Sequence, residues 1–258
     1  MNREAQSIVL LLIGGALLRI TVFSDVYLRY VKPGLRWYLV AAGVVLVVAA
    51  VITLWRELFG NSAPPVEANA ASESSEASES NEADDGHGHA HHGGPRVAWL
   101  LLLPVLTIFL IGPPSLGSYA ADKQGATAVQ QPSSDLPPLP AGDPVTISVL
   151  DYVTRAIWEN GASLRGREAR LTGFVTVGPD GTAYLTRIVL SCCAADGRPL
   201  KVALAGVQPA TLERDAWITV VGGYDPARRT DPVSREAVPT IAVRTLTRIE
   251  PPAEPYDS

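Results

Sequence analysis

Residues 37–55 read WYLVAAGVVLVVAAVITLW, a run of 19 residues without a charged side chain. In an α-helix that rises 1.5 Å per residue, this run extends about 29 Å, close to the roughly 30 Å hydrocarbon thickness of a bilayer. Trp37 and Trp55 lie at its two ends, where amphipathic rings favour the headgroup region. The stretch predicts a transmembrane helix and decides the class of the protein, a chain anchored in the lipid bilayer.

Two other apolar stretches predict further spans. The first, residues 8–28, precedes the run by a connection too short for a domain, so residues 1–60 are expected to form an antiparallel transmembrane hairpin. The second begins at Val97 and predicts a third transmembrane helix over residues 97–120, kinked at Pro104. The Lys and Arg residues are spread too evenly over the connections to decide which side of the membrane the C-terminal part occupies.

The segments that flank the third span have the composition of irregular chain. Residues 61–96 form an acidic, histidine-bearing loop, in which residues 61–94 hold seven acidic residues and no Lys or Arg. Such a segment buries too little apolar surface to fold and is expected to be disordered. Residues 121–146 are rich in proline and read as a linker.

Residues 147–258 have the pattern of a small, soluble, mainly β domain. Leu150, Val153 and Ile157 follow a helical spacing, which predicts a short amphipathic helix within residues 147–160. Alternating apolar positions then predict five strands, at residues 171–177, 183–190, 200–207, 217–223 and 240–249. Five strands in this length favour a closed, OB-like barrel, and a five-stranded sandwich is the alternative.

Charge and motif content narrow the function of this domain. From Val145 onward there are 13 basic and 13 acidic residues, so the basic surface expected of a nucleic-acid-binding protein is missing. The domain holds no histidine, no glycine-rich phosphate loop and no serine nucleophile motif. We therefore expect no nucleic-acid partner and no enzymatic activity.

Histidines and cysteines supply two candidate metal sites. His87, His89, His91 and His92 lie beside carboxylates in a Gly-containing loop, a composition suited to transient capture of zinc or another divalent transition metal. The alternative is a solvated low-complexity run that binds no metal.

The second candidate metal site is the only pair of cysteines in the chain. Cys192 and Cys193 are adjacent, and Asp196 follows three residues later. Such a pair can share a soft metal, form a strained vicinal disulfide or act as a redox couple, and the neighbouring Arg187 can lower a thiol pKa if it projects nearby. The alternative is that one cysteine fills the core and the other has no role.

Arg19 lies within the first apolar stretch, where a charged side chain is unfavourable against lipid. Two explanations fit it. It pairs with an acidic group of a partner subunit, or its side chain extends to the headgroup region.

The chain also resembles a known family. Leu17-Leu18-Arg19, Arg29-Tyr30-Val31-Lys32-Pro33 and above all Leu190-Ser191-Cys192-Cys193-Ala194-Ala195-Asp196 are similar to segments of the YcgQ-like bacterial membrane proteins, which are described as permease subunits. The resemblance implies a multi-pass protein of the bacterial inner membrane that acts with a separate polytopic permease. It assigns no role to the two cysteines or to Asp196.

Two functions follow as expectations. The first is a non-enzymatic accessory subunit of a bacterial membrane permease, linked to metal ion transport or homeostasis, with Arg19 at the partner contact. The second is a membrane protein that senses metal or thiol redox state through Cys192, Cys193 and the histidine loop, with no transport partner.

Overall fold

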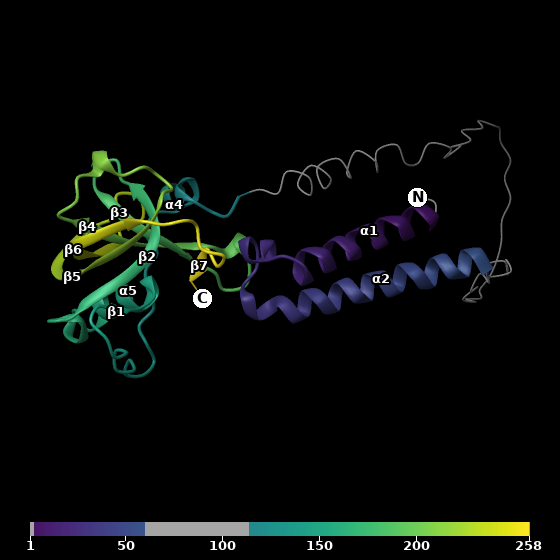
Figure 1. Ribbon diagram of the computed structural model, residues 1–258, viewed down its shortest axis with the longest axis horizontal. Coiled ribbons are helices and arrows are strands. Elements are labelled where there is room, and N and C mark those ends of the chain that lie inside the picture. The colour runs from purple at the N-terminus through teal and green to yellow at the C-terminus, as the bar shows by residue number, and fades with distance from the viewer. Residues whose placement is uncertain (1–2, 60–113, 258) are drawn as a thin grey trace, which may run out of the picture. The chain divides into compact units, whose positions relative to one another are not determined.

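The computed structural model describes residues 3–59 and 114–257. Contacts divide these described residues into two compact units, residues 3–17 with 42–59 and residues 18–41 with 114–257. The first unit holds most of two long helices, and the second holds a β domain together with the connection between those helices (Figure 1). Residues 97–113 of the predicted third span, the acidic loop and the four histidines lie outside the described residues, whereas residues 114–117 of that span have no regular secondary structure and residues 118–120 begin the short helix α4 (Ser118–Gln124).

Two antiparallel helices, α1 (Arg3–Val22) and α2 (Arg36–Phe59), pack through small side chains (Figure 1). A Cβ atom built on Gly14 would lie 3.0 Å from the carbonyl oxygen of Gly43, so only glycine permits this approach. Nearby, the hydroxyls of Ser7 and Thr53 lie 2.9 Å apart. Small residues and interhelical hydroxyl pairs are the contacts by which helices associate in lipid.

The expectation of three transmembrane helices is not met within the part of the chain that the structure describes. One helix there, Pro33–Arg56, is long and apolar enough to cross a membrane, and only 11% of its most apolar window is buried. The predicted span at residues 8–28 is wrong in extent, because α1 ends at Val22 and its apolar part, Ser7–Val22, extends only about 24 Å. The Ser24 hydroxyl donates to the Ile20 carbonyl just beyond this end.

The C-terminal region forms a closed five-stranded barrel, as predicted. In ring order, β2 pairs with β5, β5 with β6, β6 with β4, β4 with β3, and β3 again with β2. All of these pairs are antiparallel except β4 with β6. Because each strand has a neighbour on both sides, the sandwich alternative is wrong. The strands are β2 (Glu168–Val177), β3 (Ala183–Val189), β4 (Arg198–Ala205), β5 (Trp217–Thr230) and β6 (Ala237–Arg248).

Short elements extend this barrel. β1 (Val145–Thr146) adds to β2, and β7 (Tyr256–Asp257) adds to β3, and neither was predicted. A two-residue strand has too few positions for apolar and polar residues to alternate, so the sequence pattern does not reveal it. The remaining short elements are η1 (Val26–Arg29), η2 (Pro33–Leu35), α4 (Ser118–Gln124), η3 (Ala162–Leu164), η4 (Ala194–Asp196) and η5 (Pro209–Thr211).

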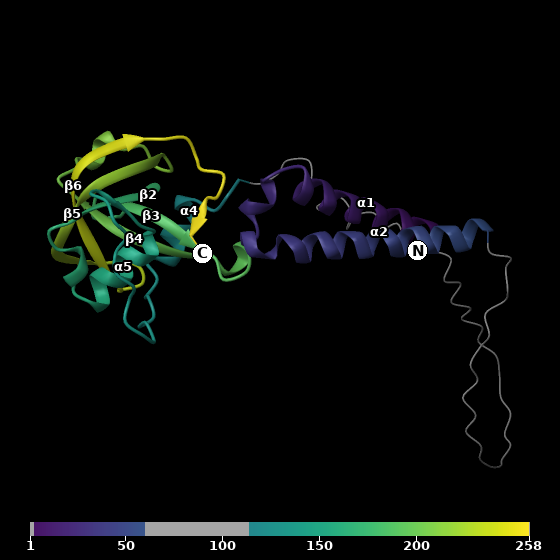
Figure 2. The ribbon, with the colours of Figure 1, turned by 60° about the horizontal axis from the view of Figure 1, so that its bottom comes forward.

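The predicted amphipathic helix is α5 (Val149–Trp158), which contacts β2, β3, β4 and β6 at one end of the barrel (Figure 2). It begins after Ser148, whose hydroxyl accepts a hydrogen bond from the Asp151 amide at 3.0 Å. This is a standard N-cap. Its buried apolar face shares one core with alternate residues of the strands, among them Leu171, Leu185, Val202, Val220 and Ile241.

A glycine allows the barrel to coil tightly where β5 meets β6. A Cβ on Gly222 would lie 2.2 Å from the carbonyl oxygen of Ala242, and the pairing register shifts between Val221 and Gly222. A side chain at this position would force the strands apart, so glycine is required at this bulge.

Residues 127–144, within the predicted linker, have no regular secondary structure but are held against the barrel domain. Val129 and Leu139 pack on the main core. The Arg155 guanidinium donates to the Pro137 carbonyl at 2.7 Å. This proline-rich segment is therefore part of the folded domain and does not act as a free spacer.

Candidate functional site

The candidate site is the loop that leaves β3 and enters η4. Leu190, the residue after β3, is still paired with β7, because its amide donates to the Asp257 carbonyl. The chain then turns through Ser191, Cys192 and Cys193, and the Cys193 carbonyl accepts from the Asp196 amide as η4 begins. The predicted pair of cysteines thus lies on a short, defined turn between two strands.

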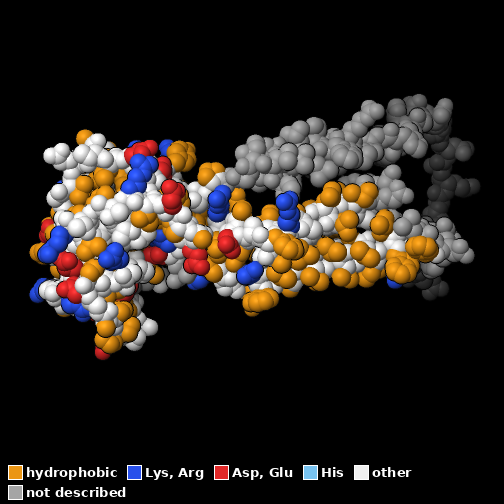
Figure 3. All heavy atoms as spheres, viewed as in Figure 1, with side chains coloured by type: hydrophobic (Ala, Val, Ile, Leu, Met, Phe, Trp, Pro, Cys, Tyr) orange, Lys and Arg blue, Asp and Glu red, His pale blue; other side chains and the backbone are white. Residues whose placement is uncertain are grey.

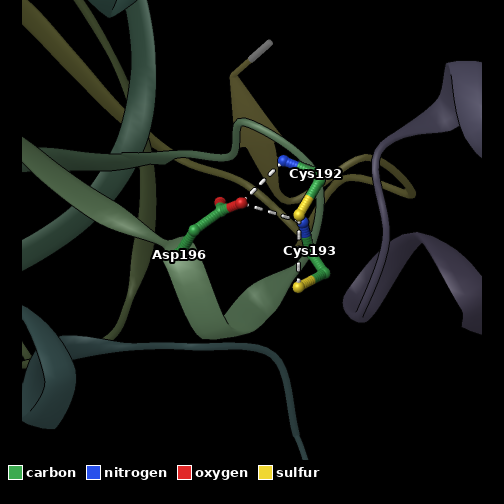
Figure 4. Close-up of side chains that lie close together, drawn as sticks. All are labelled: Cys192, Cys193 and Asp196. Atoms are coloured by element: carbon green, nitrogen blue, oxygen red, sulfur yellow. Dashed lines mark hydrogen bonds between the residues drawn. The ribbon is translucent and has the colours of Figure 1, made fainter.

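The Asp196 carboxylate organises this turn (Figure 4). One oxygen accepts from the Ser191 amide at 2.8 Å. The other accepts from the amides of Cys192, at 2.8 Å, and Cys193, at 3.3 Å. Three backbone donors on one carboxylate fix the loop and favour the ionised acid. Hydrogen bonds from the Cys192 thiol and from these amides lower the pKa of Asp196 to about 2.

The two thiols lie beside this carboxylate. Cys192 Sγ is 3.5 Å from Cys193 Sγ, and both cysteines are free. Cys192 is exposed and Cys193 is partly exposed. The Asp196 carboxylate, to which the Cys192 thiol hydrogen-bonds, is the main reason why the pKa of Cys192 is raised to about 12. In the metal-free loop, Cys192 is therefore a protonated thiol and a weak nucleophile at neutral pH.

Arg187 does not lie where it could lower the pKa of a thiol. Its guanidinium lies 3.1 Å from the Asp257 carboxylate and donates to the Glu254 carbonyl, and its Cζ atom is 5.0 Å from the centre of the Trp217 ring. Burial lowers the pKa of Arg187, and the pair with Asp257 opposes that effect. Arg187 stabilises the end of the barrel, and the idea that it lowers a thiol pKa is wrong.

The ligand atoms of Cys192, Cys193 and Asp196 all lie within 4.8 Å of one another. With Zn–S bonds of about 2.3 Å, two sulfurs 3.5 Å apart subtend about 99° at the metal, about ten degrees less than the tetrahedral angle. A bound dication would displace the thiol protons, since thiolates are the metal-binding form. Two sulfurs and one oxygen leave a fourth position open, as in exchangeable sites and unlike structural zinc sites.

The cysteine turn is hydrogen-bonded to the connection between the two long helices. The Lys32 amide donates to the Cys192 carbonyl at 3.1 Å, and the Ala194 amide donates to the Tyr30 carbonyl at 2.7 Å. Val31 and Cys193 form an isolated antiparallel bridge. Residues 30–32 were predicted only as part of a short connection between two helices, because backbone pairing between distant segments leaves no mark in a local sequence pattern.

The other predicted site residues are not part of this cluster. Arg19 is exposed near the end of α1. His87, His89, His91 and His92 lie outside the described residues. Among described residues, the sequence reasoning missed Tyr256, whose hydroxyl donates to the Arg29 carbonyl and accepts from the Leu116 amide.

Residues 143–257 match a family model described as the DUF1980 C-terminal domain. The match covers the barrel, α5 and the cysteine turn, and it includes neither α1 nor α2. Comparisons with curated proteins and with solved structures gave no match. The match concerns the barrel domain, and membership of a permease-associated membrane family stays a prediction.

Proposed function

We propose that this protein is a membrane-anchored, non-enzymatic accessory subunit of a bacterial permease, and that its barrel domain captures a soft divalent metal at Cys192, Cys193 and Asp196. One observation carries the proposal. The three potential ligands lie within 4.8 Å of one another on a turn that is hydrogen-bonded to residues 30–32, the connection between the two apolar helices. A metal bound there would be coupled through these hydrogen bonds to the connection between α1 and α2.

Exposed apolar side chains support the membrane anchor. Along α2, Val45 is 66% exposed and Trp55 is 65% exposed. Figure 3 shows hydrophobic side chains over most of the visible surface of α1 and α2, whereas charged groups are interspersed on the barrel. Contiguous apolar surface of this kind is unfavourable in water and marks contact with lipid or with another protein.

Arg19 supports a partner within the membrane. The residue is exposed in a helix whose neighbouring residues are apolar. A guanidinium in that position is stable against lipid only if it reaches the headgroups or an acidic group of another chain. We propose the second arrangement, with a polytopic permease in the bacterial inner membrane as the partner.

The strand order supports an OB-like classification of the barrel. If the barrel strands β2, β3, β4, β5 and β6 are numbered 1 to 5, their order around the barrel is 1-2-3-5-4, and strand 4 pairs again with strand 1. Strands 3 and 5 are parallel. OB folds bind ligands through their surface loops and strands. A binding role for this domain is therefore consistent with its architecture, although fold alone does not define the ligand.

The chemistry of the thiols supports binding over catalysis. All four histidines of the chain lie in residues 87–92, so the barrel has none to act as a general base. The raised pKa of Cys192 makes it a weak nucleophile, whereas a bound dication would compensate the loss of its proton. The histidine loop is proposed as an auxiliary source of ligands that raises the local metal concentration.

A thiol-redox sensor is the second candidate, and the 3.5 Å separation of the two free sulfurs favours it. Under this alternative the pair would be oxidised by exchange with a disulfide of another protein, and no permease would be required. The two functions differ in their partner and in their response to metal.

Partner capture tests the accessory function. The full chain would carry an N-terminal tag, because β7 at the C-terminus is paired with β3. It would be purified from native membranes in mild detergent, and its partners identified by mass spectrometry. We expect a polytopic permease with the wild type and a strong loss with Arg19→Leu, but not with Arg165→Leu in the barrel. Recovery of the protein without any permease, from the wild type as well as from the variants, would contradict the accessory function.

Metal analysis tests the site. In a background with His87, His89, His91 and His92 changed to Ala, we expect one zinc per chain in the wild-type loop. The double variant Cys192→Ser/Cys193→Ser should lose that zinc, and Ser191→Ala should retain it. Equal zinc content in all three proteins would refute the site and leave the redox alternative.

A further inference from the structure

A pocket of about 350 Å³ lies on the outer surface of the barrel domain, away from the cysteine turn. Val177 and Pro179 border it at the turn between β2 and β3, and Pro232 and Val233 border it at the loop between β5 and β6. Its volume falls at the lower end of the range of small-molecule sites, which combine apolar walls with a few polar groups.

The floor of the pocket contains a buried hydroxyl without a structural use. Tyr184 on β3 is 1% exposed and lines the pocket. Its Oη atom is buried and makes no hydrogen bond of standard geometry among the residues that the structure describes, and the Thr182 side chain only partly opposes the rise in its pKa that burial causes. Because an unpaired buried hydroxyl is destabilising, native proteins retain few of them without a reason. A bound ligand that accepts a hydrogen bond would supply one.

Lys201 on β4 places an ammonium beside this phenol. Its Nζ atom lies 5.7 Å from the centre of the Tyr184 ring and 2.9 Å from an oxygen of Asp231. Asp231 is fully buried, and its other oxygen accepts from the amides of Val233 and Ser234. An ammonium has three hydrogens, so this fixed ion pair leaves donors available to a ligand.

Arg214 forms the charged rim. Its side chain is 46% exposed, pairs with Asp122, and donates to the Val177 carbonyl at 3.0 Å. Exposed ion pairs are weak, so Asp122 neutralises this guanidinium only in part and the rim keeps some positive charge. Tyr184 Oη and Lys201 Nζ are the donors at the floor, Asp231 is the buried acid paired with Lys201, and Asp122 is the acidic side chain at the rim.

We propose that this pocket binds a small organic monocarboxylate, whose oxygens accept hydrogen bonds from Tyr184 Oη and Lys201 Nζ and whose apolar body lies between Val177 and Val233. A single negative charge fits best, because Asp231 already neutralises Lys201 and only the weakly paired Arg214 remains to balance a ligand, which is too little for a dianionic phosphate. The site lies on the surface formed by the second and third barrel strands and two loops, which carries ligands in many OB folds. It is independent of the metal site.

Benzoate and its neutral isostere benzamide test the proposal. Binding to the full chain in detergent micelles would be followed by saturation-transfer NMR, with empty micelles as the reference. We expect saturable binding of benzoate in the millimolar range or tighter, and at least tenfold weaker binding of benzamide. Tyr184→Phe removes only the hydroxyl and should weaken benzoate binding at least tenfold with no loss of thermal stability. Tyr119→Phe removes an exposed hydroxyl outside the pocket and should change neither property.

A second variant keeps the test decisive if Tyr184→Phe does not fold. Val233 is 50% exposed at the mouth of the pocket, so Val233→Trp should block entry without touching the floor. We expect it to abolish benzoate binding. Absence of benzoate binding to the wild type, equal binding of benzamide, or retained binding in either pocket variant would overturn the proposal. None of these results depends on Cys192 or Cys193, so they leave the metal site untouched.

Discussion

Replacing Asp196 by Asn should activate the Cys192 thiol. Hydrogen bonding to the Asp196 carboxylate is the largest cause that raises the pKa of Cys192 from an ordinary 9.0 to about 12. The amide of asparagine has almost the same shape but carries no charge, so it is a weaker acceptor for the Cys192 thiol and no longer repels the thiolate. The test uses a Cys193→Ser background, which leaves one thiol in the chain.

The magnitude follows from the thiolate fraction and its nucleophilicity. At pH 8 a thiol of pKa about 12 is ionised to about one part in 10⁴, and one of pKa 9.0 to about one part in 11, a ratio of about 900. Nucleophilicity falls with pKa, with a Brønsted coefficient of about 0.4–0.5, which reduces the gain by about 16–32-fold. We expect alkylation to accelerate by at most about 30–60-fold, because the Cys193→Ser background already removes the part of the pKa shift that Cys193 causes.

The assay is the rate of iodoacetamide modification of the full chain in detergent, measured by intact mass between pH 7 and 10. Cys192 is already exposed, so a change in rate reports its ionisation and not its accessibility. Asp180→Asn, in the exposed turn after β2, is the matched control and should leave the rate unchanged. A rate in Asp196→Asn within threefold of the background would refute the argument that this carboxylate controls the thiol.

Three further predictions concern the stability of the barrel, measured by chemical unfolding of the full chain in detergent. Gly222→Ala should destabilise it by about 1–3 kcal/mol, because the new methyl would overlap a carbonyl of β6, whereas Gly223→Ala has open space around it and should have a much smaller effect. Lys201→Met should destabilise by about 3–5 kcal/mol by leaving Asp231 buried without its cation, and the additional change Asp231→Leu should recover much of that loss. Ser148→Ala should destabilise by about 1 kcal/mol through loss of the N-cap of α5, and equal stability to the wild type would contradict that role.

Local pattern was sufficient to predict much of the barrel. All five predicted strands are present, since alternation of apolar residues reports which face of a strand is buried. The same holds for α5, whose apolar spacing and Ser148 cap are local signals. The end of the first helix was misplaced by several residues, because hydropathy does not register the change of backbone direction after Val22.

The order of amino acids was enough to establish the apolar character of the N-terminal helices, the strand content of the C-terminal domain and the presence of two adjacent thiols beside an acid. The three-dimensional fold was needed to establish that the strands close into a ring, that Arg187 pairs with Asp257 and not with the thiols, and that residues 30–32 are hydrogen-bonded to the cysteine turn. The pocket above Tyr184 and Lys201 likewise combines residues from separate strands and loops. The physical reason is common to all of these: periodicity records which side of an element is buried, whereas pairing between distant backbone groups and charges depends on which elements meet.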